Sequence, residues 1–426
     1  MSSLMRKMFL LSLLAVGAGC LGAADFFAIP ADGGADLSPD KVYPQGRLFP
    51  FSGFQPKSLK ETKDAFFTMA GPGYGPRIQS LTKEACELKM PMIYTIHANY
   101  NGKPLLKAQF DAKGVSLDWE QIRSDIERQV KTALASGVDV GWWYLQPEEL
   151  RFWRKDEIKY LKVAYETIRA ADPLKRPVWM YNPNHYDIEG LKKYTGLMDI
   201  MGKGMYANYS GNKSSRVWCR WSSENQVKAI EATGAKSFAI CVPEMFEEPA
   251  AGSMDKIESW VRHDVYLSLI CGSKGVVVFS LATRPTLSAD AHSRYYAAYK
   301  QVARELNGPV GLGQVFLFGK RCNDLHGKVI SGPAEVSITP LPRKPDVFKY
   351  PSVTFADVSY KTGRYFLAVN SAEEPVGYEL SGFPPEAVKF TDVVSGKELT
   401  VARGGLLKLD FRPLEVKLLR MTPNLQ

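Results

Sequence analysis

Short apolar runs alternate regularly with helix-patterned segments from residue 48 to residue 306, and this alternation most constrains the fold. The apolar runs are too short for typical helices, so they predict strands. Between them, apolar residues recur at helical spacing, as Ile122, Ile126 and Val130 do in the helix predicted over 118–136. Eight strand–helix units in about 260 residues are the size and rhythm of a (β/α)8 TIM barrel. We predict this α/β fold for residues 25–308, with an irregular lead-in before the first strand.

The predicted elements follow one another along the chain without a long gap. Strands are predicted at 48–54, 66–70, 92–97, 140–146, 177–181, 199–206, 237–242 and 275–281. After a short first helix from Pro56, helices are predicted at 78–89, 118–136, 155–171, 188–194, 224–233, 254–271 and 289–306. A doubly wound sheet would also alternate, but it usually needs fewer strands. No glycine-rich turn has the Rossmann or P-loop form.

The character of the sequence changes after Asn307-Gly308-Pro309. Helical periodicity stops, and short alternating segments follow between turn residues. This pattern is typical of a β-sandwich, which we predict for residues 309–426. The region carries no concentrated set of titratable groups, so we expect it to pack against the barrel, with glycan binding as the alternative role.

The N-terminus has the layout of a secretory signal peptide over residues 1–24. Arg6 and Lys7 precede an apolar core at 8–16, and small residues follow at 17–24. We therefore expect export to the periplasm or the extracellular space. The residues before Cys20 also resemble a bacterial lipoprotein box, so a lipid anchor at Cys20 is the alternative. No later run is apolar and long enough to predict a membrane span.

The formal net charge of +9 is spread thinly over 426 residues, without a Lys/Arg run of the nucleic-acid type. We therefore expect no nucleic-acid partner. The charge suits an anionic glycan substrate, or it serves only solubility. No CxxC motif and no His/Cys cluster occurs, so we expect no metal and no cofactor.

Two strands end in the same way, with a proline followed by glutamate. Pro147 precedes Glu148 and Glu149 after the fourth strand, and Pro243 precedes Glu244 after the seventh. Catalytic groups of such barrels lie at the carboxyl ends of the strands, and strands four and seven are nearly opposite in an eight-stranded ring. Glycosidic cleavage needs one carboxylic acid and a second carboxylate. The alternative is that the first pair of glutamates caps the next helix or binds a nearby arginine.

The other strand ends supply aromatic, amide and cationic side chains, the types that stack on sugar faces and bind sugar hydroxyls. The predicted substrate-binding residues are His97, Asn99, Trp143, Gln146, Trp179, Tyr181, Asn182, His185, Tyr209 and Arg284.

The glutamates ending strands four and seven resemble the arrangement of the clan-A (β/α)8 glycoside hydrolases. In that clan the strand-four glutamate is the acid/base, the strand-seven glutamate is the nucleophile, and anomeric configuration is retained. The resemblance implies that Glu148 or Glu149 is the acid/base and Glu244 the nucleophile. It also implies that Tyr206, at the end of strand six, hydrogen-bonds the nucleophile. The motif departs from the clan in two places. Gln146-Pro147-Glu148 stands where the clan usually has asparagine just before the strand-four glutamate, and Phe279-Ser280 replaces the tryptophan that is frequent at the end of strand eight.

The sequence thus predicts a secreted, retaining glycoside hydrolase that acts on a polysaccharide or complex glycan. Neighbouring rings and a second carboxylate would raise the pKa of its acid. Two alternatives stay open. One is a non-catalytic glycan-binding barrel, and the other is a polysaccharide lyase with Tyr206 and His185 as base and acid.

Overall fold

The computed structural model describes residues 49–110, 116–211, 215–341, 344–383, 388–401 and 405–423. The predicted signal peptide, Cys20 and the lead-in lie outside the described residues. Within the described ranges, no helix has both the length and the apolar character needed to cross a bilayer.

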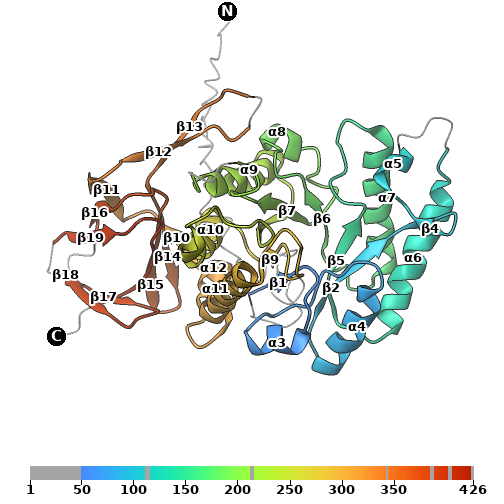
Figure 1. Ribbon diagram of the computed structural model, residues 1–426, viewed down its shortest axis with the longest axis horizontal. Helices are drawn as coiled ribbons and strands as arrows, with labels where there is room; N and C mark the ends of the chain where they lie inside the picture. The colour runs from blue at the N-terminus through green and yellow to red at the C-terminus, as the bar shows by residue number, and fades with distance from the viewer. Residues whose placement is uncertain are drawn as a thin grey trace, which may run out of the picture.

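A curled, seven-stranded parallel sheet with surrounding helices forms the first part of the chain (Figure 1). Its strand order is β1-β9-β8-β7-β6-β5-β2. This sheet and the antiparallel sheets that follow it confirm the predicted fold class. The strands are β1 (Phe51–Gly53), β2 (Met92–His97), β5 (Val140–Gln146), β6 (Val178–Asn182), β7 (Ile200–Met205), β8 (Phe238–Pro243) and β9 (Val276–Val278).

The second predicted strand, at 66–70, is reduced to a single bridge between Ala70 and Met92. The Thr68 side chain takes over bonds that a backbone ladder would make. Its hydroxyl accepts from the Phe51 N–H (2.9 Å) and donates to the carbonyl of Phe49 (2.7 Å). This segment therefore joins β1 to β2 with few bonds, in the place of an eighth strand.

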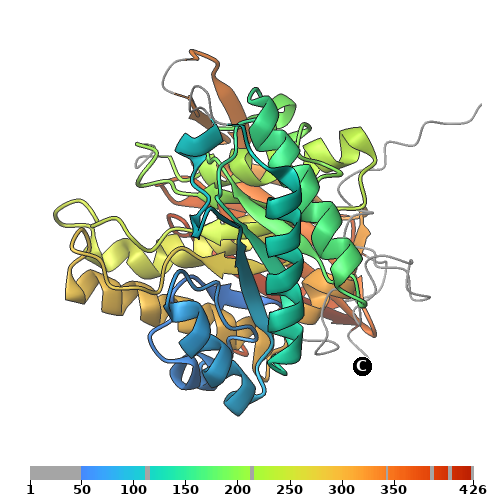
Figure 2. The same cartoon turned by 90° about the vertical axis from the view of Figure 1, so that its right-hand side faces the viewer.

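Helices cover the outside of the sheet, and α6 and α7 run side by side along one flank (Figure 2). In α6 the predicted face of Ile122, Ile126 and Val130 is buried, and Asp118 caps the first turn through its side chain. The helices of the barrel are α3 (Leu59–Asp64), α4 (Arg77–Leu88), α6 (Trp119–Ala135), α7 (Lys155–Ala171), α8 (Ile188–Leu191), α9 (Trp218–Thr233), α10 (Ile257–Ile270) and α11 (Ala289–Asn307).

Some elements are absent from the sequence-based prediction. A small hairpin and a helical turn follow β2 where a long loop is predicted, and a further helix follows α11. These are β3 (Asn99–Tyr100), β4 (Lys103–Pro104), α5 (Lys107–Phe110) and α12 (Leu312–Phe318). A 3-10 turn, η1 (Met254–Lys256), precedes α10.

The C-terminal part contains a six-stranded and a three-stranded antiparallel sheet that share an apolar core. The rings of Phe355 and Tyr378, one from each sheet, lie 6.4 Å apart. The larger sheet contains β10 (Lys320–Cys322), β14 (Val353–Tyr360), β15 (Gly363–Asn370), β17 (Val388–Asp392), β18 (Glu398–Val401) and β20 (Val416–Pro423). The smaller contains β11 (His326–Ser331), β16 (Val376–Ser381) and β19 (Leu407–Phe411).

The C-terminal part also extends a separate hairpin, β12 (Glu335–Ile338) and β13 (Phe348–Pro351), toward α9. The Arg220 guanidinium of α9 lies 4.9 Å from the Tyr350 ring centroid. The Trp218 indole of α9 donates to the carbonyl of Pro340. Aromatic and guanidinium contacts therefore attach the β-domain to one flank of the barrel.

Aromatic rings fill the barrel interior, and glycines on β7 make room for them. Trp179 packs against Tyr144, with ring centroids 4.7 Å apart, and against Phe54. A Cβ added at Gly202 would lie 2.6 Å from the Trp179 ring, and one at Gly204 would lie 2.4 Å from the Tyr181 hydroxyl oxygen. Strand β7 therefore contributes no side chain at these two inward positions.

We expect Gly202→Ala to lower the free energy of unfolding by about 1–3 kcal/mol, because overpacking displaces the Trp179 ring. Chemical denaturation measures this loss. Met201→Leu, a volume-conserving change at the neighbouring buried position, is the control and should cost less. Equal stability of Gly202→Ala and wild type would contradict the packing described above.

Candidate active site

Glu148 lies at the carboxyl end of β5, held by two tyrosines. Pro147 has no N–H for the sheet, and strand pairing stops before it. The Tyr144 hydroxyl, from an inward position of β5, donates to Glu148 Oε2. The Tyr74 hydroxyl, from the loop after the Ala70 bridge, donates to the same oxygen at 3.3 Å. The carboxyl group is therefore oriented by phenols from two separate segments of the mouth.

The surroundings of Glu148 favour its protonated form. Burial raises its pKa above the ordinary value, and the charge of Glu149 adds to the increase. The hydrogen bonds from Tyr144 and Tyr74 and the charge of Lys107 oppose it. The net upward shift is what a carboxyl group needs to donate a proton near neutral pH.

Glu149 reaches the same mouth because the strand does not continue past Gln146. Its φ of 55° turns the chain, and its N–H donates to the Tyr181 carbonyl (3.0 Å). Its half-exposed carboxylate forms an ion pair with Lys107 Nζ at 3.3 Å. Two neighbouring carboxyl groups therefore stand at one strand end, one in a phenolic setting and the other paired with a cation.

Glu244, after β8, lies in a different setting. Its side chain is 2% exposed, and its two oxygens accept from the backbone N–H groups of Asn208 (2.7 Å) and Tyr209 (3.1 Å). Arg216 Nη2 is 3.9 Å from Oε1 and also pairs with Asp264. Burial raises the Glu244 pKa to about 7, although Arg216 and the two N–H groups oppose the increase. The role of Glu244 as a nucleophile stays a prediction.

Tyr206 lies among the phenols near Glu148. Its ring stacks on that of Tyr181 with centroids 5.9 Å apart and an interplanar angle of 13°. Burial raises the Tyr206 pKa well above its ordinary value, and the charges of Tyr181 and Glu148 contribute. Among the described residues, the hydrogen-bond donors to the Glu244 carboxylate are backbone groups rather than this phenol.

The structure brings Tyr181, Tyr209 and Arg284 to the same end of the barrel as Glu148 and Tyr206. The Phe246 ring lies 5.0 Å from the ring of Tyr206 and 5.4 Å from that of Tyr209. Tyr209 is 60% exposed, so its ring is available to a ligand at the mouth.

Other predicted binding residues are turned away from the mouth or buried. Trp143 lies on the outer face of the sheet, where its indole donates to Asp172, and Trp179 lies in the interior. Both side chains are fully buried, so the prediction that they stack on substrate is wrong. Because side chains alternate along a strand, Trp143 points outward and Trp179 points into the core.

The predicted amides and histidines also differ in their surroundings, since some are bonded within the barrel or buried and others are at least partly exposed. Asn99 bonds to Asp125 of α6, and His97 Nε2 lies 2.8 Å from the Leu105 carbonyl. Asn182 is fully buried beside its register partner Lys203. Gln146 is half-buried at the end of β5, while His185 is exposed.

Sequence reasoning missed Tyr74, Tyr144, Lys107, Phe246 and Phe279. Tyr74 follows the second strand position, so reading that strand end would have found it. Tyr144 stands two residues before Gln146 and therefore shares its inward face. Lys107 belongs to the unpredicted turn after β2, and no sequence pattern indicated its ion pair.

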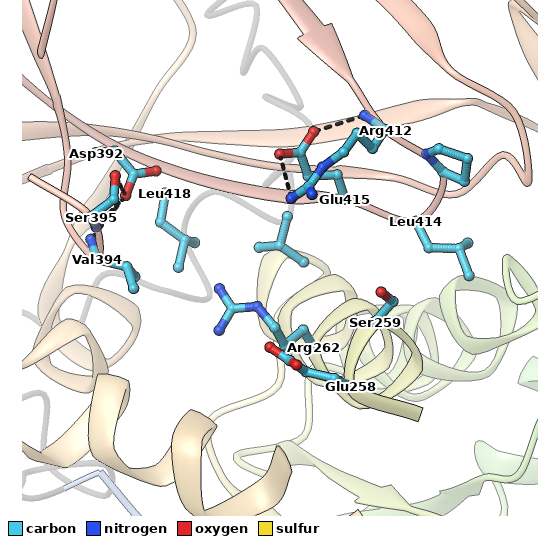
Figure 3. Close-up of a pocket in the computed structure, with 12 residues that line it drawn as sticks. Glu258, Ser259, Arg262, Asp392, Val394, Ser395, Arg412, Leu414, Glu415 and Leu418 are labelled. Atoms are coloured by element: carbon cyan, nitrogen blue, oxygen red, sulfur yellow. Dashed lines mark hydrogen bonds and ion pairs between the residues drawn. The ribbon is translucent and has the colours of Figure 1, made fainter. Parts of the chain in front are cut away.

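A cavity of about 470 Å³ lies elsewhere, between α10 and the β-domain (Figure 3). None of its lining residues is aromatic. Its arginines are already paired, Arg262 with Glu305 and Arg412 with Glu415. Carboxyl groups, phenols and aromatic rings gather instead at the barrel mouth, so we place the candidate site there.

Searches with the sequence find no matching protein-family model and no matching curated protein. Comparison of the fold gives clear matches. An α-amylase from Geobacillus thermoleovorans, solved with acarbose, aligns with a TM-score of 0.52 at 10% identity, covering 89% of this chain and 97% of that one. An Anoxybacillus α-amylase, described as a new glycosyl hydrolase subclass, aligns with a TM-score of 0.51 at 9% identity, covering 86% and 89%. The chain has the fold of TIM-barrel glycoside hydrolases with a C-terminal β-domain.

The raised pKa of Glu244 predicts a specific pH dependence of stability. The folded-state pKa of Glu244, about 7, exceeds the ordinary 4.5. Its contribution to the free energy of unfolding is therefore fully present below about pH 4.5 and is lost as pH rises through 7. The glutamine of the Glu244→Gln variant cannot ionise. The melting temperature of this variant should therefore fall less steeply than that of wild type as pH rises over this range.

Exposed Glu166 of α7 supplies the control, since Glu166→Gln should leave the pH dependence unchanged. An unaltered slope in Glu244→Gln would contradict the assigned pKa.

Proposed function

We propose that this protein is a glycoside hydrolase in which Glu148 is the general acid. The observation that carries the proposal is the setting of Glu148. A half-buried carboxyl group with a raised pKa, held by Tyr144 and Tyr74, lies at the carboxyl end of β5. The overall fold, shared with glycosyl hydrolases, supports the same assignment.

In the proposed reaction, Glu148 donates its proton to the glycosidic oxygen as the bond from that oxygen to the anomeric carbon breaks. The second carboxylate either attacks the anomeric carbon, which retains configuration, or activates a water. Glu244 is the candidate from the clan-A resemblance, and Glu149 is the alternative because it stands beside Glu148. The exposed ring of Tyr209 supplies a surface for the apolar face of a sugar.

The proposed substrate is a polysaccharide or complex glycan outside the cell. The predicted signal peptide at 1–24 is the basis for proposing export, with lipidation at Cys20 as its alternative.

Glu148→Gln should lower kcat on natural glycans by about 10²–10⁴-fold, the usual contribution of a general acid. Activity on an aryl glycoside with a good leaving group should fall much less, because that leaving group departs without a proton. A glycan panel resolved by mass spectrometry measures both. Glu149→Gln and Glu244→Gln are assayed in parallel, and their melting temperatures are measured. Loss of activity at an unchanged melting temperature identifies the second catalytic carboxylate, whereas a lowered melting temperature identifies a structural one. Full activity of all three variants would refute the proposal.

Tyr144→Phe and Tyr74→Phe should move the alkaline limb of the kcat profile to higher pH. Their hydroxyls stabilise the ionised form of Glu148, so their loss raises the Glu148 pKa and keeps the acid protonated at higher pH. Tyr94→Phe, on the outer face beside Trp143, is the control and should not shift the profile. A shift to lower pH would be the opposite of this expectation.

A second candidate function is glycan binding without turnover. It is favoured by the burial of Glu244 and by the engagement of both its oxygens with backbone N–H groups. Glycan affinity in wild type with no products from any substrate would support it. A lyase role for Tyr206 is disfavoured, because burial raises the pKa of this phenol well above its ordinary value, so very little of it is ionised and able to accept a proton near neutral pH. Elimination would leave an unsaturated sugar, which mass spectrometry detects.

A further inference from the structure

Arg284 follows β9 and lies half-buried on two aromatic rings. Its guanidinium carbon is 4.7 Å from the centroid of Phe279 and 5.6 Å from that of Phe246. Its Nε donates to Ser280 Oγ at 3.2 Å. These contacts hold the planar group in one place without using its terminal nitrogens.

Within the part of the chain that the structure describes, no carboxylate lies within 4.0 Å of this guanidinium. Other arginines of limited exposure in the barrel each have one. They are Arg77, Arg123, Arg151, Arg169, Arg176, Arg216, Arg220 and Arg262. A partly desolvated guanidinium is stabilised by a paired anion, so the position of Arg284 is suited to an anion that comes from outside the chain.

Arg284 also belongs to the surroundings of the proposed acid. Burial raises the pKa of Tyr74 well above its ordinary value, the charge of Glu148 adds to the increase, and the charge of Arg284 opposes it. Tyr74 is therefore close to both groups. The exposed ring of Tyr209 lies beside Phe246, on which Arg284 rests. A sugar bound at Tyr209 would be near this guanidinium.

We propose that Arg284 binds an oxyanion of the substrate, so that the glycan is acidic and carries a carboxylate or a sulfate ester. A guanidinium offers a planar pair of donors that matches both groups. The ion pair of Lys107 with Glu149 offsets one of the two neighbouring glutamates, which lowers the repulsion that an acidic sugar would meet. This inference rests on the proposed sugar-binding role of the mouth and names the class of sugar.

The test measures binding of matched sugars by calorimetry, with Glu148→Gln as background so that turnover is slowed during the measurement. Short oligogalacturonate supplies the carboxylate, a sulfated galactose oligomer supplies the sulfate ester, and a neutral galactose oligomer is the uncharged match. Arg284→Gln in this background should weaken the acidic ligand about tenfold to hundredfold, the range for a charged hydrogen-bonded pair, and leave the neutral ligand unchanged. Whichever acidic arm responds identifies the anion.

Two further variants control for charge and for folding. Arg294→Gln removes an exposed arginine of α11 that pairs with Asp290, and it should not change affinity. Arg284→Lys keeps the charge but loses the paired donors, so it should recover part of the affinity. Unchanged melting temperatures establish that both Arg284 variants fold.

The outcomes separate this inference from the proposed hydrolase function. Equal weakening of acidic and neutral ligands by Arg284→Gln, or equal binding of both by the Glu148→Gln protein, would overturn the role of Arg284. Wild-type cleavage of acidic and neutral glycans at equal rates, with Arg284→Gln changing neither rate, would also overturn it, while the hydrolase proposal would stand. Arg284-dependent binding of acidic sugars without cleavage of any glycan would uphold the inference and overturn the hydrolase proposal.

Discussion

The space that β7 leaves open inside the barrel determines which side chains can be held at its mouth. Gly202 and Gly204 have no side chains, and the volume beside them is taken by Trp179 and Tyr181 of the neighbouring strand. Trp179 in turn supports Tyr144, whose hydroxyl orients Glu148. Because interiors are close-packed, a change of one methyl group at these glycines is transmitted through rigid rings to the carboxyl group. The candidate chemistry therefore depends on the packing beneath it.

The two strand–proline–glutamate motifs acquire opposite surroundings from this arrangement. Glu148 meets phenol hydroxyls and apolar rings in a half-buried position, so it has a raised pKa and retains an accessible side. Glu244 meets backbone N–H groups and Arg216 in a position that is almost fully buried. Similar local sequence thus yields two chemically different carboxyl groups.

A buried polar chain connects the second of these groups to the β-domain. Asp264 pairs with Arg216, which lies near Glu244, and also contacts His263 Nδ1 at 2.8 Å. His263 Nε2 lies 3.0 Å from Ser371 Oγ in the β-domain. Buried polar groups are stabilised only when each finds a partner, so the β-domain helps to complete the network around Glu244.

Much of the architecture follows from local patterns in the chain. Alternating apolar runs and amphipathic segments place the strands and helices near their observed positions, since each element must bury its own apolar face. The second strand is the exception, because the Thr68 hydroxyl replaces ladder bonds that periodicity cannot reveal. The strand-end rule likewise locates Glu148, Glu149, Tyr181 and Arg284 at one end of the barrel.

The order of elements, the two-part architecture and the strand ends that supply polar groups all follow from the pattern of residues along the chain. Which of those polar groups come into contact depends on the folded arrangement. Trp143 and Trp179 point outward and inward because strand alternation acts relative to a core that the linear pattern does not define. Tyr74 and Tyr144 bond one oxygen of Glu148 from segments 70 residues apart. That contact exists only once the curled sheet has brought the two segments together. The position of a residue within its strand sets the face to which its side chain points. The burial of that side chain and the groups that it contacts depend on residues far away in the chain.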